Sequence, residues 1–216
     1  MMSKQKLSQD EIDKIVVAGR VVSKPTSLGG GVVDVDFFVS VDSKNIWQYK
    51  LWQNMLYRAY CPKQELRFPT YVGVTVCNEW LYFGNFLEWV NREVGYGGHK
   101  KGVALDKDLL IKGNKVYCPE ACSFVPDAIN LLLVDSGAIR GEWPVGVCFN
   151  KRKGKFMAGL SLDGRQKYLG LFLTPEEASA AYKIAKEARV KIVATQHRDS
   201  IKPAVFESLM NWEIEP

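Results

Sequence analysis

The sequence predicts an α+β fold in two parts, and three patterns lead to this prediction. The first half holds two stretches with aromatic and aliphatic residues at helical spacing. Near the C-terminus, three short stretches of alternating residues precede one alanine-rich stretch of helical character. Between these regions, residues 134–144 contain two glycines and a proline and have the composition of a linker. With 47% hydrophobic residues over 216 positions, the chain can bury a core in each part.

The two aromatic stretches are predicted to be helices that face a core. Trp47, Leu51 and Met55 recur at helical spacing, and Pro62 ends the pattern. The second stretch, residues 80–93, has the same periodicity and stops before a glycine-rich break. At this spacing aromatic side chains belong to a core far more often than to a base-stacking surface, so we assign both stripes to the core.

Residues 105–133 are predicted to form a hairpin followed by a helix. Two strand-like stretches, 105–111 and 115–118, flank a Gly-Asn turn that begins at residue 113. Residues 1–45 are predicted to be a lead-in with one short polar helix and one strand.

The C-terminal part is predicted to be a three-stranded antiparallel sheet packed on one helix. The strands are separated by a KRKG turn and by Asp163-Gly164, which is a strong hairpin signal. Thr174 should cap the helix, with Pro175 at its first position and Glu177 completing a capping box. The predicted lead-in, first domain, linker, second domain and C-terminal tail are residues 1–45, 46–133, 134–144, 145–195 and 196–216.

Positive charge is concentrated in one short window of the chain. Residues 151–170 contain six lysines and arginines against Asp163 alone. The window therefore carries +5, which is also the formal charge of the whole chain, so the remaining residues sum to zero. A solvated pair of strands would explain scattered lysines, but so dense a cluster is typical of surfaces that bind a phosphate backbone.

One face of the middle strand is predicted to be open beside this basic window. Phe156, Ala158 and Leu160 alternate with Lys155 and Met157, so the apolar set can pack on the helix. A twisted ribbon of strands that carries cations fits the major groove of DNA. We therefore predict that double-stranded DNA is the partner.

Cysteine usage and hydropathy indicate the expected compartment and exclude several function classes. Five cysteines, an odd number, do not suggest a disulfide framework, and Cys118 with Cys122 would supply only half of a zinc site. No stretch of about 18 apolar residues is present, so we expect a cytoplasmic protein without a membrane partner. Signatures for nucleotide hydrolysis and acyl transfer are also missing, and no organic cofactor is expected.

The basic window carries a family resemblance. The stretch GVCFNKRKGKFMAGLSLDGRQKYLGLFLTPEEASAAYKIAKEA resembles the DNA-binding domain of ethylene-response factors (ERF), in the divergent form attached to phage and mobile-element endonucleases. The matching elements are Gly146-Val147, Gly154-Lys155-Phe156, Ala158, Leu169-Gly170, Phe172 and the run from Thr174 to Tyr182. Cys148, Asn150 and Gln166 stand where plant members usually carry arginine, so the resemblance implies groove binding without the plant base preference. From the resemblance and the charge cluster, the predicted DNA-binding residues are Asn150, Lys151, Arg152, Lys153, Lys155, Met157, Arg165, Gln166, Lys167 and Tyr168.

Residues 49–130 resemble the first part of phage-encoded His-Asn-His (HNH) homing-type endonucleases. The matching stretches are WQNMLYRAYC, PTYVGVTVCNEW, FGNFLEWV and LDKDLLIKGNKVYCPEACSFVPDAIN. The resemblance implies a domain containing a ββα unit that holds one divalent cation such as Mg²⁺ and hydrolyses phosphodiesters. It also implies a bacteriophage origin, with the host cell cytoplasm as the location.

The same resemblance assigns the residues of a nuclease site. The metal ligands fall on Asp106 and Asn130, and Lys107 stands where the family has a histidine that acts as general base. A lysine with an ordinary pKa of about 10.4 is a poor base at neutral pH. His99, in a loop rich in glycine and lysine, is the candidate that would replace it.

Three interpretations of this site are open. In the first, Asp106 binds Mg²⁺ with Asp108 or Asn130, His99 is the base, and the protein is a nicking or homing-type endonuclease. In the second, the site is inactive and the hairpin adds a second DNA-binding surface, so the protein is a phage regulator or an inhibitor of a host DNA-associated protein. In the third, the two aspartates only cap a turn in which Asn114 takes a left-handed position.

Overall fold

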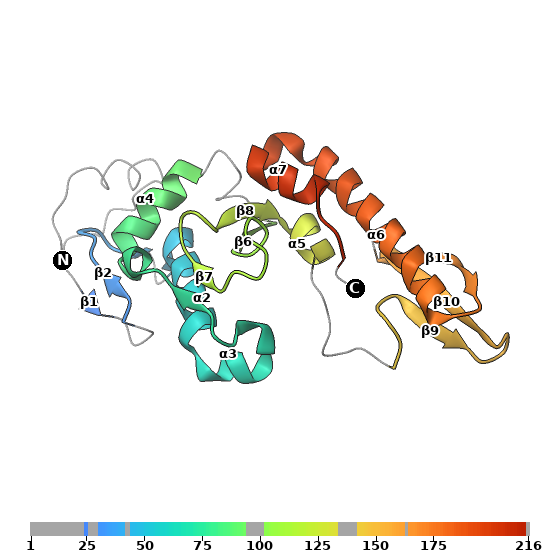
Figure 1. The fold of residues 1–216 in the computed structure, drawn as a ribbon. Coiled ribbons are helices and arrows are strands. Elements are labelled where there is room, and N and C mark those ends of the chain that lie inside the picture. The colour runs from blue at the N-terminus through green and yellow to red at the C-terminus, as the bar shows by residue number, and fades with distance from the viewer. Residues whose placement is uncertain are drawn as a thin grey trace. The chain divides into compact units, whose positions relative to one another are not determined.

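The computed structural model of the chain has two compact units, residues 1–126 and 127–216 (Figure 1). The described residues combine helices with small sheets, so the predicted α+β class is confirmed. The predicted polar helix within residues 1–45 lies outside the described part of the chain. The structure describes residues 24–25, 30–41, 44–93, 102–133, 142–162 and 164–214.

Both predicted helices of the first unit are confirmed. Proline lacks a backbone N–H and disfavours helical geometry in the residue before it. The first helix therefore ends at Tyr60, and Cys61 is extended ahead of Pro62. The second helix begins three residues later than predicted, because residues 78–81 form a 3-10 turn. The helical elements are α2 (Trp47–Tyr60), α3 (Pro62–Arg67), η1 (Pro69–Tyr71), η2 (Asn78–Leu81) and α4 (Phe83–Glu93).

The aromatic stripes of these helices form the core of the first unit, as predicted. Trp52 is fully buried, and its indole Nε1 donates a hydrogen bond to the carbonyl oxygen of Trp80 at 2.7 Å. The Trp80 ring in turn packs edge-on against Phe86 and tilted against Trp89. The indole N–H therefore finds its partner inside the core, which removes the cost of burying a polar group.

The strands of the first unit pair between distant segments of the chain. The antiparallel pairs are β1 (Lys24–Pro25) with β2 (Val32–Val33), β3 (Ser40–Val41) with β4 (Lys44–Asn45), and β6 (Val103–Asp106) with β8 (Ser123–Pro126). A parallel pair joins β5 (Thr75–Val76) to β7 (Val116–Tyr117).

The predicted hairpin between residues 105–111 and 115–118 is therefore wrong. The carboxylate of Asp106 accepts hydrogen bonds from the backbone N–H groups of residues 108 and 109 and turns the chain at the end of β6. That turn prevents β6 from continuing into a hairpin strand. Instead β6 pairs with β8, whose four residues are all buried.

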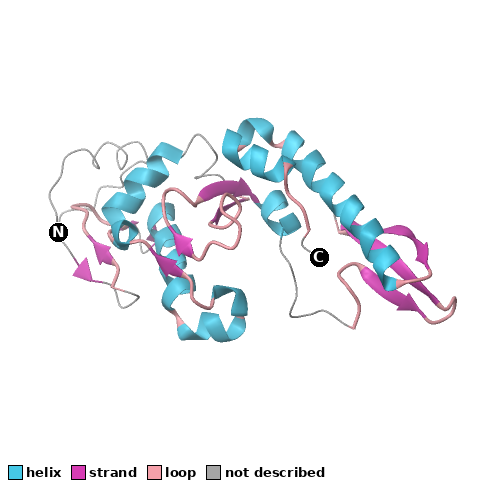
Figure 2. Cartoon of the chain, in the orientation of Figure 1, coloured by secondary structure: helices cyan, strands magenta, loops and turns pink. Residues whose placement is uncertain are grey.

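The second unit contains the predicted three-stranded sheet packed on one helix. Figures 1 and 2 show the strands beside the first half of the long helix, with the last helix folded back along its second half. The elements are α5 (Asp127–Leu133), β9 (Val147–Asn150), β10 (Lys155–Leu162), β11 (Arg165–Phe172), α6 (Pro175–Gln196), η5 (Arg198–Ser200) and α7 (Pro203–Met210).

Two features of this unit add to the predicted division of the chain. Helix α5, which the sequence analysis placed in the first domain, packs on α6 and falls in the second unit. The stretch predicted only as a tail contains α7, which buries Val205 and Leu209. Helix α6 extends beyond the sheet, and both of these short helices pack against it.

Candidate nucleic-acid interface

One face of the β9–β11 sheet is closed by α6. Strand β10 is central, with β11 and β9 on its two sides. From β10, Ala158 and Leu160 are buried, and from α6, Ala178 and Tyr182 are buried. The small alanine side chains allow the helix to lie close to the strands. The apolar half of the predicted alternation is therefore the packed half.

Helix α6 lies so close to the start of β9 that position 146 must be a glycine. This residue has φ +74°, and a Cβ atom placed on it would lie 2.1 Å from Cδ2 of Tyr182. Such a distance is far inside van der Waals contact, so only glycine fits. The entry to β9 is thereby pressed against the ring of Tyr182.

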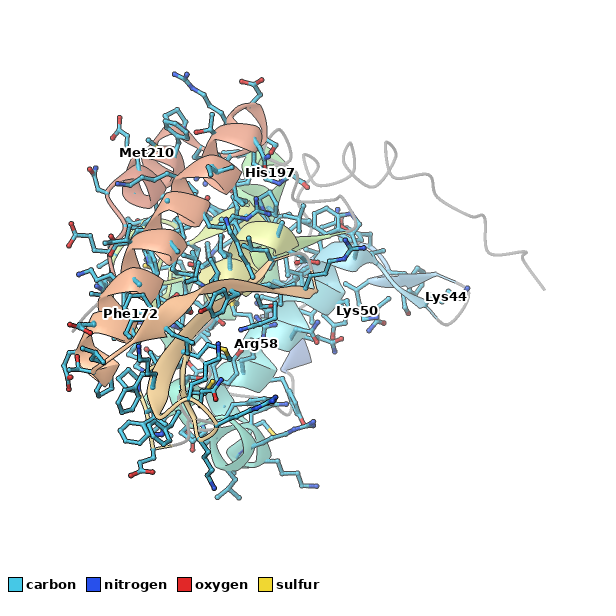
Figure 3. All side chains as sticks on the ribbon, turned by 90° about the vertical axis from the view of Figure 1, so that its right-hand side faces the viewer. Lys44, Lys50, Arg58, Phe172, His197 and Met210 are labelled. Atoms are coloured by element: carbon cyan, nitrogen blue, oxygen red, sulfur yellow. The ribbon has the colours of Figure 1, made fainter. Side chains whose placement is uncertain are left out.

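The start of α6 has the predicted capping box. The Oγ1 atom of Thr174 accepts a hydrogen bond from the backbone N–H of Glu177 at 3.2 Å, and Oε2 of Glu177 accepts from the N–H of Thr174 at 3.3 Å. Pro175 occupies the first position of the helix, as expected. In Figure 3, Phe172 and His197 mark the two ends of this helix.

The opposite face of the sheet is open. Residues directly opposite one another in antiparallel strands point to the same face. The side chain of Gln166 lies across Gly159, where a Cβ atom would be 2.6 Å from its Nε2 atom, and Tyr168 beside it is 59% exposed. The pairs that share this face are Lys155 with Asn150, Met157 with Cys148, Gly159 with Tyr168, and Ser161 with Gln166.

The register separates the predicted DNA-binding residues of β11 into two groups. Gln166 and Tyr168 lie on the open face, whereas Arg165 and Lys167 lie opposite Leu162 and Leu160 on the other face. All four β11 side chains are exposed, because β11 is an edge strand and this end of the hairpin is little covered. A bulge at residue 169 then brings the rest of β11 back into register.

The turn between β9 and β10 carries the densest part of the charge. Lys151, Arg152 and Lys153 are all exposed in this turn, and Lys155 is exposed at the start of β10. The Oδ1 atom of Asn150 accepts a hydrogen bond from the N–H of Lys153 at 3.1 Å, which orders the turn. The turn, together with the start of β10, is therefore an ordered projection of the sheet that presents four cations.

These cations have no acidic partner among the residues that the structure describes. Two ion pairs in that part of the chain join Lys107 to Asp108 and Lys183 to Glu187, and neither involves a residue of the turn. Asp163, the single acidic residue of the window, lies outside the described residues. Exposed cations without partners repel one another, so an incoming polyanion would relieve that repulsion.

The candidate metal ligand Asp106 is engaged by the backbone of its own turn. Its Oδ1 atom accepts hydrogen bonds from the N–H groups of Asp108 at 3.0 Å and Leu109 at 2.7 Å. Burial, reinforced by the negative charge of Asp108, raises the pKa of Asp106, and the two N–H donors oppose the shift. This geometry matches the third interpretation, in which Asp106 caps a turn.

Lys107 and Asn114 hold the same turn from its other side. Lys107 is only 8% exposed, and its Nζ donates to Oδ2 of Asp108 at 2.9 Å and to the carbonyl oxygen of Asn114 at 3.0 Å. The Nδ2 atom of Asn114 donates to the carbonyl oxygens of Lys107 and Val116 at 2.6 and 2.7 Å. A lysine held in this way is an anchor for the loop.

Two further residues, Asn130 and His99, were predicted for the nuclease site. Asn130 is half-buried on α5, in the second unit, and His99 lies outside the described residues. The charged neighbour that the sequence analysis missed is Arg58 of α2, which acts electrostatically on Asp106 and is hydrogen-bonded to the Tyr117 hydroxyl. Burial raises the pKa of Tyr117 to about 12, against the effect of that guanidinium. No spacing in the sequence connects residue 58 to residue 106.

The same geometry bears on whether these residues can hold a divalent cation. Across the described ranges, no three histidine, cysteine, aspartate or glutamate side chains come close enough together to hold a metal ion. The carboxylate of Asp108 is paired with Lys107, and one oxygen of Asp106 already has two donors. These residues therefore do not fit the metal site that the resemblance implies.

Comparisons with known proteins add no assignment. The chain matches no family model, no curated protein and no solved structure. In the described part of the chain, no helix has the length and apolar character needed to cross a membrane. The ERF and HNH resemblances accordingly stay predictions, and the function is argued below from the geometry.

Proposed function

We propose that this protein binds double-stranded DNA through the β9–β11 sheet. The observation that carries the proposal is the fixed, exposed turn of residues 151–153, whose cations have no acidic partner in the described part of the chain. This turn stands beside a sheet face that α6 leaves open. Cations would hold phosphates while neighbouring side chains reach the base edges.

The open face has the chemistry needed for contact with bases. Asn150 and Gln166 offer amides that can both donate and accept hydrogen bonds, and Met157 and Tyr168 offer apolar contact. The B-DNA major groove is about 12 Å wide and admits a ribbon of strands. Arg165 and Lys167, on the opposite face of the edge strand, would contact the phosphates that flank the groove.

In the first unit, the geometry supports a structural role for the predicted nuclease residues over a role in hydrolysing phosphodiesters. Asp106, Lys107 and Asn114 use their polar atoms to hold one turn. On this proposal the protein is a non-catalytic regulator that occupies DNA. The exposed basic turn of the second unit and the resemblance to phage proteins support such a role.

DNA binding is tested by fluorescence anisotropy of a labelled duplex at increasing salt. The variant Arg152→Ala/Lys155→Ala removes two cations from the proposed interface, and the matched variant Lys183→Ala/Lys191→Ala removes two from α6. Each lost phosphate contact should reduce the slope of log K against log salt by about 0.9, so the first variant should lose about 1.8 and the control nothing. An equal loss in both variants, or no binding by the wild type, would overturn the proposal.

The absence of catalysis is tested separately with supercoiled plasmid in the presence of Mg²⁺, Mn²⁺ or EDTA. The wild type and Asp106→Ala should both leave the plasmid intact while retarding it in a gel. Metal-dependent nicking by the wild type that disappears in Asp106→Ala would show that Asp106 belongs to a nuclease site and refute the non-catalytic role.

A further inference from the structure

Two cysteines stand opposite each other at the end of the parallel strands β5 and β7. The paired residues are Thr75 with Val116 and Val76 with Tyr117, so partners differ by 41 in number. Cys77 and Cys118 are the next residues and keep this difference.

The hydrogen bonds show that the ladder continues to this third pair. The N–H of Thr75 donates to the carbonyl oxygen of Lys115 at 2.8 Å, and the N–H of Cys77 donates to that of Tyr117 at 2.9 Å. Both bonds join a residue of the first strand to the residue just before its partner, which is the parallel pattern. Cys77 is itself extended, with φ −61° and ψ 152°.

The two cysteine side chains share one face of the strand pair. The first pair, Thr75 and Val116, is exposed, and the second pair, Val76 and Tyr117, is buried. Successive residues of a strand alternate between faces, so Cys77 and Cys118 return to the solvent side, and both are half-buried. Neighbouring strands lie about 4.8 Å apart, which is within the Cα separation of about 4.4 to 6.8 Å found in disulfides.

Cys118 also acts electrostatically on the thiol of Cys77. Burial raises the pKa of Cys77, and negative charge on Cys118 raises it further. Cys118 has a second cysteine nearby, since the N–H of Cys122 donates to its carbonyl oxygen at 3.0 Å. Cys122, however, is completely buried, so a dissolved reagent cannot reach its sulfur.

We propose that Cys77 and Cys118 form a thiol–disulfide exchange site for a small dissolved disulfide such as oxidised glutathione. The thiolate of one cysteine attacks a glutathione sulfur, forms a mixed disulfide and releases one glutathione thiolate. The second cysteine attacks the protein sulfur of that mixed disulfide, forms the Cys77–Cys118 bond and releases the second glutathione. Two protein thiols are oxidised and one glutathione disulfide is reduced to two thiols.

The bond would close the segment that contains α4 and join the ends of β5 and β7 covalently. Burial raises the pKa of both thiols, so little of the thiolate needed for attack is present at neutral pH and more forms at alkaline pH. Oxidation should therefore be faster at alkaline pH. This inference is independent of DNA binding, since both cysteines lie in the first unit.

The experiment is disulfide mapping of the full chain after incubation with oxidised glutathione. After acid quenching and alkylation, trypsin releases Cys77 in residues 68–92, and Cys118 together with Cys122 in residues 116–140. A glutamyl endopeptidase cuts after Glu120 and separates Cys118 from Cys122. The expected product is a peptide pair linked through Cys77 and Cys118 that dithiothreitol separates.

Variants and competing products make the result decisive. The linked pair should persist in Cys122→Ala and disappear in Cys118→Ser. A bond between Cys118 and Cys122 in the wild type, or glutathione adducts without any link to Cys77, would overturn the proposal. Because mapping of the wild type needs no substitution, a variant that fails to fold leaves the test intact.

Discussion

Replacing Gly146 with alanine should destabilise the second unit far more than the same replacement at Gly164. Both glycines have left-handed backbones, with φ +74° and +78°. They differ in what a methyl group would meet. At Gly146 it would lie 2.1 Å from the ring of Tyr182, whereas at Gly164 nothing lies within 4 Å.

The size of the difference follows from that contact. A left-handed backbone costs an alanine about 1–2 kcal/mol at either position. At Gly146 the buried ring of Tyr182 must also move, and overpacking of this kind costs about 1–3 kcal/mol more. The loss of chain entropy in the unfolded state is the same for both replacements and cancels. Gly146→Ala should therefore exceed Gly164→Ala by about 1–3 kcal/mol.

The assay is hydrogen exchange in β10 at increasing urea, because these amides lie in the second unit and report its unfolding. A double-mutant cycle with Tyr182→Ala supplies the control. Removing the ring should cost less in Gly146→Ala than in the wild type, since it also removes the clash. Equal destabilisation by the two glycine replacements, or an unchanged cost of losing Tyr182, would refute the reasoning.

Three other substitutions test separate contacts. Thr174→Ala should lower the free energy of unfolding of the second unit by about 1 kcal/mol, because the N–H of Glu177 loses its acceptor, and Thr174→Ser should restore it in urea denaturation. Burial raises the pKa of Asp106 above its ordinary 3.8. The stabilisation that accompanies this shift is therefore present below pH 3.8 and is lost as the pH rises through the folded-state pKa. Asp106→Asn keeps an acceptor for the turn without titrating, so its stability relative to the wild type should increase from acid to neutral pH; a constant difference would contradict the raised pKa. Trp52→Phe leaves the buried carbonyl oxygen of Trp80 without its donor and should cost about 1–3 kcal/mol in thermal unfolding, whereas no loss would mean that the hydrogen bond adds nothing.

The second unit was largely predictable because its signals are local. The Asp-Gly turn, the alternation along β10 and the Thr-Pro-Glu-Glu cap each act within a few residues, and each predicts its own element. The +5 window is likewise a property of neighbouring residues. Even here, the sequence did not show on which face of the sheet each basic residue lies. The strand register places Arg165 and Lys167 on the face opposite Gln166.

The first unit was predictable only in its helices. The spacing of Trp52 and its neighbours identifies a buried stripe, because burial on one side of a helix repeats along the sequence. The hairpin prediction failed because strands of two to four residues leave almost no pattern in the sequence, and packing determined which strands pair. The nuclease residues were assigned by resemblance, and their spacing does not reveal that Lys107 and Asn114 would bind each other.

By itself, the sequence determined the helices, the C-terminal sheet and the location of the positive charge, since these depend on residues a few positions apart. Only the tertiary structure decided that Arg58 lies near Asp106 and that Cys77 stands opposite Cys118. Such contacts join segments some 40 or more residues apart in the chain. They form because burial of the aromatic core brings those segments together, and no local pattern records which segments will meet.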